Sequence, residues 1–368
     1  MAAAPDVVVV GGGVVGAACA RQLALAGRRV RLIERGGQAG EGWRASAGML
    51  APQIEVGADD VLFELGIAGR EYYHDHAGEL REATGVDIGL RERGIVHVAA
   101  SEGEVTALKE RVAWQRQRGH HCEWLGPEEV RAEWPWLAAS YGALVAPRDG
   151  SLDPARLVEA LRKDAARLGA ELMTDTITAL TRSGDRVTGV QGGEWHPADH
   201  VILAAGAWTG RIANLPRPVS VEPVRGQLAA FPWPASVQPA IVFGCGGYLL
   251  HRDGEAIAGS TMEYAGFAAQ VTESGVAGIR ARAQALVPAL AGERVIRAWA
   301  GLRPGTPDGH PIVGPEPELA GLWYATGHGR NGVLLAGITG VFVAQLLAGE
   351  AAMEEVVERL RPERFWSW

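Results

Sequence analysis

The stretch VVVVGGGVVGAACARQLALAGRRVRLIE, residues 7–34, joins two apolar runs through a glycine-rich turn and an alanine-rich segment. Residues 7–10 are β-branched and continuous, as expected of a strand that is buried on both faces. Residues 14–26 have the composition of a helix, and residues 29–34 form a second apolar run that ends in Glu34. This order predicts a strand, a helix and a second, parallel strand.

The turn in this stretch fits the spacing GxGxxG with glycines at positions 11, 13 and 16. Gly11 permits the tight turn, Gly13 lets a pyrophosphate approach the backbone, and Gly16 allows the helix and strand to pack closely. The N-terminus of the helix offers free N–H groups to phosphate. Glu34 stands about 20 residues further on, where an acid accepts hydrogen bonds from a ribose. These parts together predict dinucleotide binding. Glu34 argues against a ribose 2′-phosphate, whereas Arg35 beside it leaves that point open.

Composition limits the function classes. The 368 residues suggest two or so domains, and the 47% hydrophobic content supports buried cores without a run that resembles a membrane span. Residues 1–6 are too short and lack the basic segment of a signal peptide, so we expect a cytoplasmic protein. A net charge of -8 without a basic tract argues against a nucleic-acid partner. Widely separated cysteines argue against a disulfide framework or a Cys-rich metal site, and they are Cys19, Cys122 and Cys245.

The remaining chain alternates between segments that predict strands and segments that predict helices. We expect further strands at 94–99, 170–173, 200–204, 226–231, 248–251 and 321–326, and helices at 103–118, 155–168, 275–287 and 333–347. The strand at 200–204 runs into Gly206, where backbone can approach a cofactor. The strand at 321–326 is followed by the loop GHGRNG, residues 327–332, and an apolar helix. The C-terminal part therefore repeats the strand, glycine-rich loop and helix of the N-terminus.

The stretch GLRPGTPDG, residues 301–309, places Arg303 among glycines and prolines. A guanidinium held by a restricted backbone suits a planar anion such as a carboxylate. By contrast, the histidines at 74, 76, 120, 121 and 251 lack a spacing that suggests a metal site or catalysis.

Five motifs together carry a family resemblance. In chain order they are VVVVGGGVVGAACA, ERGGQAGEGWRASAGMLAP, VILAAGAWTG, GLRPGTPDGHPIVGP and GHGRNGVLLAGITG. Across nearly the whole chain they resemble the flavin-dependent amine oxidases of the D-amino-acid oxidase group, and within it the glycine oxidases of thiamine biosynthesis. The resemblance implies an α/β fold with a Rossmann-like, noncovalent FAD-binding domain, discontinuous in sequence, over 1–84, 146–216 and 300–368. It also implies an α+β substrate domain on a mostly antiparallel sheet over 85–145 and 217–299.

Site residues follow from the same resemblance. Arg303 would bind the substrate carboxylate, with Tyr248 and Arg330 assisting and Met262 forming a wall of the pocket. The residues expected to bind FAD are Gly11, Gly13, Val14, Val15, Gly16, Glu34, Arg35, Gly42, Trp43, Ala47, Gly48, Met49, Thr178, Gly206, His328, Gly329, Arg330, Asn331, Gly332, Val333 and Leu334. Gly42 and Trp43 depart from the small hydroxyl residues of relatives, so the sequence leaves the shape of that loop open.

The implied reaction is oxidative deamination of glycine, sarcosine or small D-amino acids by hydride transfer to flavin N5. O2 becomes H2O2, and the imine gives glyoxylate or enters thiazole synthesis. Positioning carries such chemistry, so no acid–base residue and no metal are expected. His328 would shape the flavin loop. The resemblance also suggests a homo-oligomer, a tetramer in relatives.

Three alternatives remain open on sequence grounds: a sarcosine oxidase, a D-amino-acid dehydrogenase, and a flavin module in RNA modification. The absence of cysteine between 290 and 330 argues against the covalent flavin of monomeric sarcosine oxidases. No basic face or fused partner domain supports the RNA-modification alternative.

Overall fold

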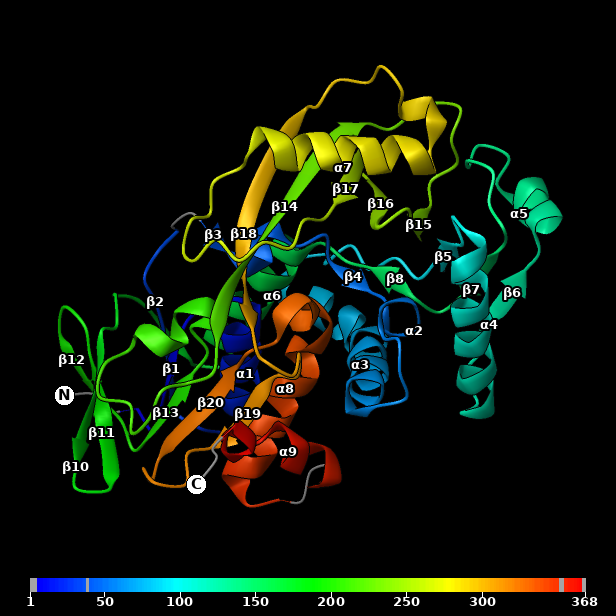
Figure 1. Ribbon diagram of the computed structural model, residues 1–368. Helices are drawn as coiled ribbons and strands as arrows, with labels where there is room; N and C mark the ends of the chain where they lie inside the picture. Colours follow the sequence, from blue (N-terminus) through cyan, green and yellow to red (C-terminus); the bar gives the residue numbers. More distant parts are fainter. Residues whose placement is uncertain (1–4, 38–39, 351–353, 366–368) are drawn as a thin grey trace.

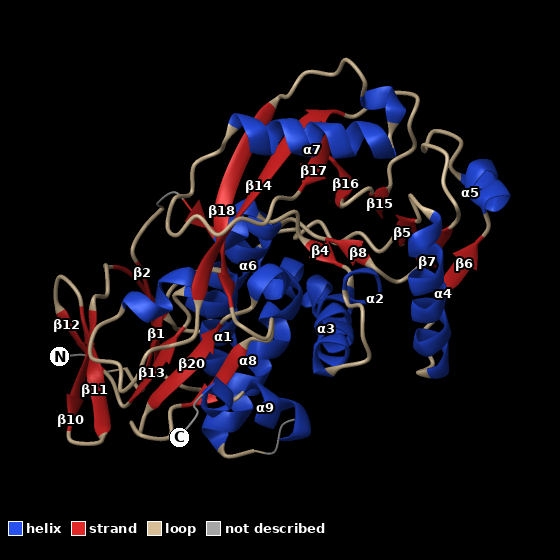
Figure 2. Ribbon diagram, viewed as in Figure 1, coloured by secondary structure: helices blue, strands red, loops and turns tan. Residues whose placement is uncertain are grey.

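A computed structural model describes residues 5–37, 40–350 and 354–365. Residues 1–4 of the N-terminal segment and residues 38–39 of the second motif lie outside this description. Two large sheets dominate the described chain, and the longest helices pack against them (Figure 1). The chain passes between the two sheets several times, so that each sheet collects strands from distant parts of the sequence (Figure 2).

The first sheet has six strands in the order β19-β20-β13-β1-β2-β9. Pairing is parallel throughout except between β19 and β20. Its strands are β19 (Ile312–Pro315), β20 (Leu322–Thr326), β13 (His200–Leu203), β1 (Val7–Val10), β2 (Val30–Glu34) and β9 (Glu171–Thr174). The predicted strand–helix–strand unit is confirmed, because α1 (Val14–Leu25) connects the parallel neighbours β1 and β2.

Alternation along β1 explains the two layers that cover this sheet. Val7 and Val9 belong to a core cluster that includes residues of the helices α1, α3 (Val61–Thr84), α6 (Pro154–Arg167) and α8 (Gly332–Ala348). Val8 and Val10 belong to a second cluster, with Leu180 and residues of neighbouring strands. That second side carries a three-stranded antiparallel sheet of β10 (Ala179–Ser183), β11 (Arg186–Gln191) and β12 (Trp195–Pro197). All four valines of β1 are therefore buried, as their continuous run predicts.

The second sheet has nine strands in the order β3-β18-β14-β17-β16-β15-β5-β7-β6. Pairing is antiparallel except at β18–β3 and β15–β5. Its strands are β3 (Gly40–Glu41), β18 (Arg297–Gly305), β14 (Glu222–Pro232), β17 (Glu255–Gly259), β16 (Gly247–Arg252), β15 (Ile241–Gly244), β5 (Ile95–Val98), β7 (Ala143–Ala146) and β6 (Glu123–Leu125). The expected α/β fold with a mostly antiparallel second sheet is confirmed.

Helices cover both faces of the nine-stranded sheet. On one face lies α7 (Glu273–Leu286), which runs across the strands in Figure 1. Toward the other face lie α4 (Glu102–Gln117) and the short elements η1 (Gly42–Ala45) and α2 (Pro52–Glu55). The remaining elements are β4 (Met49–Leu50), β8 (Gly150–Ser151), α5 (Pro127–Glu133), η2 (Gly206–Arg211), η3 (Pro288–Leu290), η4 (Gly329–Asn331), α9 (Glu354–Leu360) and η5 (Pro362–Phe365).

Strand pairing differs from the predicted division of the chain at two places. The boundary at residue 300 falls inside β18, which stays paired with β14 as far as Gly305. β3 also joins the nine-stranded sheet, although the prediction assigned residues 1–84 to the other part. Both differences concern β18, which pairs with β14 on one side and with β3 on the other. The nine-stranded sheet therefore includes residues on both sides of the predicted boundaries.

The apolar helix α8 contradicts the expectation that no segment resembles a membrane span. Residues Gly329–Ala348 are long and apolar enough by composition, with a mean hydropathy of 1.8. The structure packs this segment against neighbouring helices, and 56% of its apolar window is buried. Gly340 lies so close to α1 that a Cβ there would stand 2.7 Å from the carbonyl oxygen of Ala18. Its apolar composition therefore matches its position between α1 and α3.

Candidate active site

A cavity of about 860 Å³ runs from the glycine-rich turn after β1 to the inner strands of the nine-stranded sheet. Most of the sequence-predicted site residues line it. They are Gly11, Gly13, Val14, Val15, Glu34, Arg35, Gly42, Trp43, Ala47, Met49, Thr178, Gly206, Tyr248, Met262, Arg303, His328, Gly329, Arg330, Gly332 and Val333. Segments separated by some 300 residues in sequence thus meet at one cavity.

Four predicted residues do not line this cavity. Gly16 lies against the turn, where a Cβ would come within 1.8 Å of the Gly11 oxygen, and Gly48 lies against the Leu152 carbonyl. Leu334 is buried in the helical core, where Gly69 of α3 lies so close that a Cβ on it would come within 2.4 Å of the Leu334 carbonyl oxygen. Asn331 is also buried. Gly16, Gly48 and Leu334 therefore lie at close backbone contacts, where they allow the turn and the helices to pack.

The turn after β1 has the geometry that its glycines predict. Gly11 has a φ of +102°, and a Cβ there would lie 2.5 Å from the Ala204 oxygen of the neighbouring strand. The Gly12 N–H donates to Glu34 Oε2 at 2.6 Å. Within the described residues no side chain caps the N-terminus of α1, so its first amides are available to an anion. Turn, acid and helix end therefore face one end of the cavity.

Arg162 supports this turn, and sequence reasoning missed it. Its Nε donates to the Gly12 carbonyl at 2.8 Å, and its Nη2 lies 3.9 Å from Glu34 Oε2. Arg162 lies on α6, some 150 residues away in sequence, so no local motif could indicate the contact.

Trp43 and Trp208 line the cavity from η1 and η2. The loop at Gly42 and Trp43, which the sequence left open, is a 3₁₀ turn. The guanidinium of Arg35 lies 3.8 Å from the ring centroid of Trp208. Trp208 was not among the predicted site residues. The sequence indicated only that the backbone at Gly206, two residues earlier, approaches a cofactor.

The other end of the cavity is centred on Arg303 of β18. Its Nη1 donates to the Thr261 carbonyl at 3.0 Å, and its Nη2 donates to the Ser260 hydroxyl at 2.9 Å. Each Nη atom retains a second N–H for an anion. Burial lowers the pKa of Arg303 from its usual value, and nearby Glu55 opposes that effect. The guanidinium stays charged, because the arginine pKa starts far above neutrality.

Tyr248 and Met262 line the cavity near this position. Burial raises the pKa of the Tyr248 phenol, so the hydroxyl remains protonated and can donate a hydrogen bond. Met262 lines the cavity with 62% of its surface exposed, which places it at the rim. A partly buried phenol and an exposed thioether thus line the cavity near the guanidinium.

Arg330 lies on the same cavity but is tied to α2. Its Nη2 donates to the Glu55 carbonyl at 2.7 Å, and its Nε lies 3.1 Å from Glu55 Oε2. Glu55 was not among the predicted site residues. Its sequence signal was Pro52, which begins the short helix that Glu55 ends.

His328 is buried in the loop that precedes α8. Its Nε2 lies 3.0 Å from the Thr339 hydroxyl, and burial lowers the pKa of the imidazole to about 3. The ring is therefore neutral at physiological pH. This supports a role in holding the loop, and not in proton transfer.

Comparisons with known proteins agree with this arrangement. The model of the family described as FAD dependent oxidoreductase (DAO) matches residues 6–346. A glycine oxidase of Geobacillus kaustophilus is 36% identical over 349 residues, which are 93% of this chain and 92% of the relative. A bifunctional protein ThiO/ThiG of Synechocystis is 34% identical, over 98% of this chain and 54% of that protein. The crystal structure of glycine oxidase from Geobacillus kaustophilus superposes with a TM-score of 0.90, at 34% identity over 95% of each chain.

Proposed function

Because the chain belongs to the DAO family of FAD-dependent oxidoreductases, we propose that it oxidises glycine and related small amino acids to the corresponding imines. It is an enzyme, and FAD is its cofactor. The observation that carries the choice of substrate is Arg303, a partly buried guanidinium with free N–H groups at the end of the cavity opposite the dinucleotide turn. A small amino acid offers the carboxylate that such a group binds.

The residues present fit a noncovalently held dinucleotide. The uncapped N-terminus of α1 and the open space beside Gly13 suit a pyrophosphate, because a Cβ on Gly13 would meet only Trp43, at 3.4 Å or more. Glu34 suits the ribose hydroxyls. At the other end, the loop of His328 and the N-terminus of α8 would hold the flavin ring.

FAD, when bound, would supply the acceptor for a hydride from the substrate α-carbon and the route by which its electrons reach O2 to give H2O2. The protein residues contribute by positioning. Arg303 fixes the carboxylate and Tyr248 can donate to it, so that the α-carbon has one orientation in the cavity. The imine then reacts with water to give glyoxylate and ammonia, or it serves as a precursor for thiazole synthesis.

We further propose that the enzyme is cytoplasmic and forms a homo-oligomer. Both proposals rest on the resemblance to bacterial glycine oxidases, and sedimentation of the purified protein would test the second.

Anaerobic spectroscopy tests the proposed function directly. The purified protein should show the absorption bands of oxidised flavin, and glycine should bleach them without O2. Readmitted O2 should restore the bands and yield one H2O2 per glycine. A protein that binds no FAD would contradict the proposal. Bleaching by sarcosine, D-alanine or D-proline but not by glycine would reassign the substrate, and bleaching without peroxide would indicate a dehydrogenase.

A further inference from the structure

Glu55 lies at the substrate end of the cavity and has one carboxylate oxygen free. Its Oε2 is paired with Arg330 at 3.1 Å. The other oxygen, Oε1, accepts no hydrogen bond within the described parts of the chain and is not buried. The side chain of Glu55 is 15% exposed and lines the same cavity as Arg303. A partly desolvated carboxylate with an open oxygen therefore faces the space where the substrate would bind.

The helix α2 is held in place at both ends, which fixes the position of Glu55. Its N-terminal amides, from Gln53 and Ile54, donate to Asp149 Oδ2 at 3.0 and 3.1 Å. At its C-terminal end, Arg111 donates to the Ile54 carbonyl and Arg330 to the Glu55 carbonyl. A helix of four residues has no stability of its own, because all its backbone groups are terminal. Side chains from distant elements supply the missing partners.

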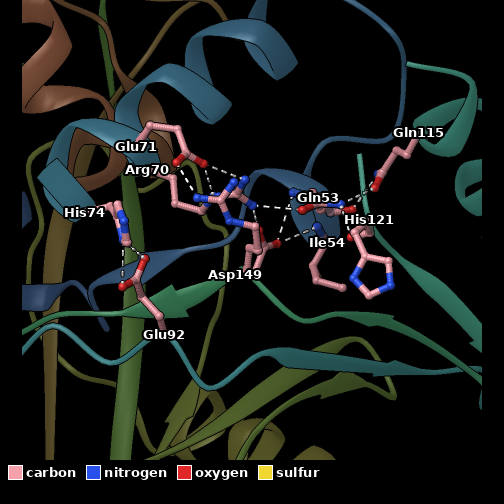
Figure 3. A network of polar contacts seen from close by, with 10 residues as sticks. Gln53, Ile54, Arg70, Glu71, His74, Glu92, Gln115, His121 and Asp149 are labelled. Carbon is pink, nitrogen blue, oxygen red and sulfur yellow. Dashed lines mark hydrogen bonds and ion pairs between the residues drawn. The ribbon is translucent and has the colours of Figure 1, made fainter. Parts of the chain in front are cut away.

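A buried polar network supports the N-terminal side of α2 (Figure 3). Arg70 donates to Asp149 Oδ1 and to Gln53 Oε1, both at 2.8 Å. The Gln53 amide donates to Gln115 Oε1 at 3.1 Å, and Gln115 returns a hydrogen bond to the Gln53 carbonyl at 2.8 Å. Arg70, Asp149 and Gln115 are all almost completely buried. Burial of charged and amide groups costs free energy unless all of them are hydrogen-bonded. We infer that this network serves to fix the position of α2.

The charges near Arg303 suit the two ends of an amino acid. Glu55 is the carboxylate whose charge acts on Arg303. The other cavity-lining carboxylates are engaged elsewhere: Glu34 with Gly12, Glu41 with Arg44, Asp175 with His196, and Glu104 with the amide of Ala100. An α-amino acid carries a carboxylate and an ammonium on one carbon, and these two groups would face Arg303 and Glu55 respectively.

We propose that Glu55 Oε1 binds the amino group of the substrate and accepts one proton from it. This rests on the proposed oxidation of an amino acid. In the step, an N–H bond of the ammonium breaks, an O–H bond forms on Glu55, and the nitrogen keeps the electron pair. The neutral amine then has the lone pair that its conversion to an imine requires. Arg303 holds the carboxylate during the transfer, so both ends of the substrate are fixed.

The surroundings of Glu55 favour a carboxylate that can take up a proton. Three charged or titratable groups from other elements interact with its charge, namely Arg330, Arg303 and Tyr248. Arg111 donates to the carbonyl of the preceding residue, Ile54. Burial raises the pKa of Glu55 above its usual value, while Arg330 and Arg303 lower it. The ionised form is the active one. Activity that depends on Glu55 is therefore present above its pKa and is lost as the pH falls through it.

The pH profile of kcat/KM for glycine in a Glu55→Gln variant tests the proposal. In the native enzyme, ionised Glu55 and zwitterionic glycine form the productive pair, so kcat/KM should be flat between the pKa of Glu55 and that of the glycine amine. In the Glu55→Gln variant only glycine with a neutral amino group reacts. The kcat/KM of the variant should then rise tenfold per pH unit up to the pKa of the glycine amino group. A variant that keeps the flat region would overturn the proposal.

Binding to the chemically reduced holoenzyme gives a second measurement, because glycine cannot be oxidised there. Titration calorimetry without O2 would compare glycine with acetate, which has a carboxylate and no amine. Glu55→Gln should weaken glycine at least tenfold and leave acetate within twofold. Glu104→Gln, which changes another cavity carboxylate, should leave both unchanged. Equal glycine binding in native enzyme and Glu55→Gln would overturn the proposal, whereas native enzyme that does not oxidise glycine at all would overturn the proposed function instead.

Discussion

The guanidinium of Arg303 lies flat against Gly226 of the neighbouring strand, so closely that a Cβ at residue 226 would come within 2.1 Å of Nη1. The two residues lie on paired strands, with Val224 opposite Arg303 and Gly226 opposite Gly301. The absence of a side chain at Gly226 thus leaves the space that the guanidinium of Arg303 occupies. From there Arg303 reaches Ser260 and Thr261 and faces the cavity.

Gly226→Ala should therefore lower activity without unfolding the protein. The added methyl group would displace the flexible end of Arg303, and a shift of about 1 Å at a positioning group can cost about a hundredfold in rate. We expect a comparable loss of kcat/KM for glycine with normal FAD content. Gly78→Ala is the control, because a Cβ there meets none of the described residues within 4 Å. Unchanged kinetics in Gly226→Ala would show that the placement of Arg303 is not limiting.

Substitutions of Arg303 distinguish the effect of its positive charge from the effect of its planar, two-pronged shape on substrate binding. Arg303→Ala should leave folded, FAD-loaded protein whose kcat/KM for glycine falls about a hundredfold or more, since a buried charge-assisted pair contributes ~2 to 5 kcal/mol. Arg303→Lys should also be poor, because an ammonium cannot form the two-pronged contact. Steady-state kinetics with peroxide detection measures both. Near-normal activity in the lysine variant would mean that only the positive charge matters.

Local patterns were sufficient to predict one end of the cavity, whereas the other end depends on distant contacts. The run Val7 to Val10 and its glycine turn predicted β1, α1 and the pairing with β2, because periodicity and glycine spacing act over neighbouring residues. Glu55 and Arg162 escaped prediction, because their partners lie 275 and 150 residues away. The predicted boundary at 300 falls inside a strand for a similar reason. Strand β18 belongs to one sheet by pairing, although the residues after it return to the other.

Glu34→Ala should weaken FAD binding. The variant removes the acceptor of the Gly12 N–H and the carboxylate proposed to bind the ribose. Hydrogen bonds to charged groups contribute ~1.5 to 3 kcal/mol, which corresponds to about a 10- to 100-fold higher Kd. Quenching of flavin fluorescence by the apoprotein measures this constant. Glu171→Ala is the control, because the side chain of Glu171 is exposed and pairs only with Arg31 of the adjacent strand among the described residues. An unchanged Kd for Glu34→Ala would contradict the assignment.

Asp149→Asn should destabilise the protein and disturb α2. The change leaves buried Arg70 without its full countercharge, and breaking one partner of a buried pair costs ~3 to 5 kcal/mol. Denaturant unfolding of the FAD-loaded protein measures the loss. The paired change Arg70→Met with Asp149→Leu should recover part of it, but not all, because the amides of Gln53 and Ile54 still lack an acceptor. Full recovery would show that the network does not hold α2.

Stability should also depend on pH through His328. Burial lowers the pKa of His328 from 6.5 to about 3. Between these values the unfolded chain binds a proton that the folded protein does not, so the unfolding free energy rises with pH across this window. The contribution of His328 is therefore fully present above about pH 6.5 and is lost as the pH falls toward about 3.

Comparison of native protein with His328→Asn isolates this term. Asparagine does not titrate and can still form a hydrogen bond with Thr339, so the variant should lose stability less steeply between pH 6.5 and pH 4 than the native protein does. His74→Asn should act in the opposite sense, because the hydrogen bond that His74 Nδ1–H donates to the Glu92 carboxylate raises the pKa of exposed His74. Its effect should be small, since exposed ion pairs contribute little. Denaturant unfolding at each pH measures both stability curves. If the unfolding free energies of native protein and His328→Asn changed equally with pH, folded His328 would bind a proton as readily as the unfolded chain does. The loop before α8 would then have to accommodate a buried cation.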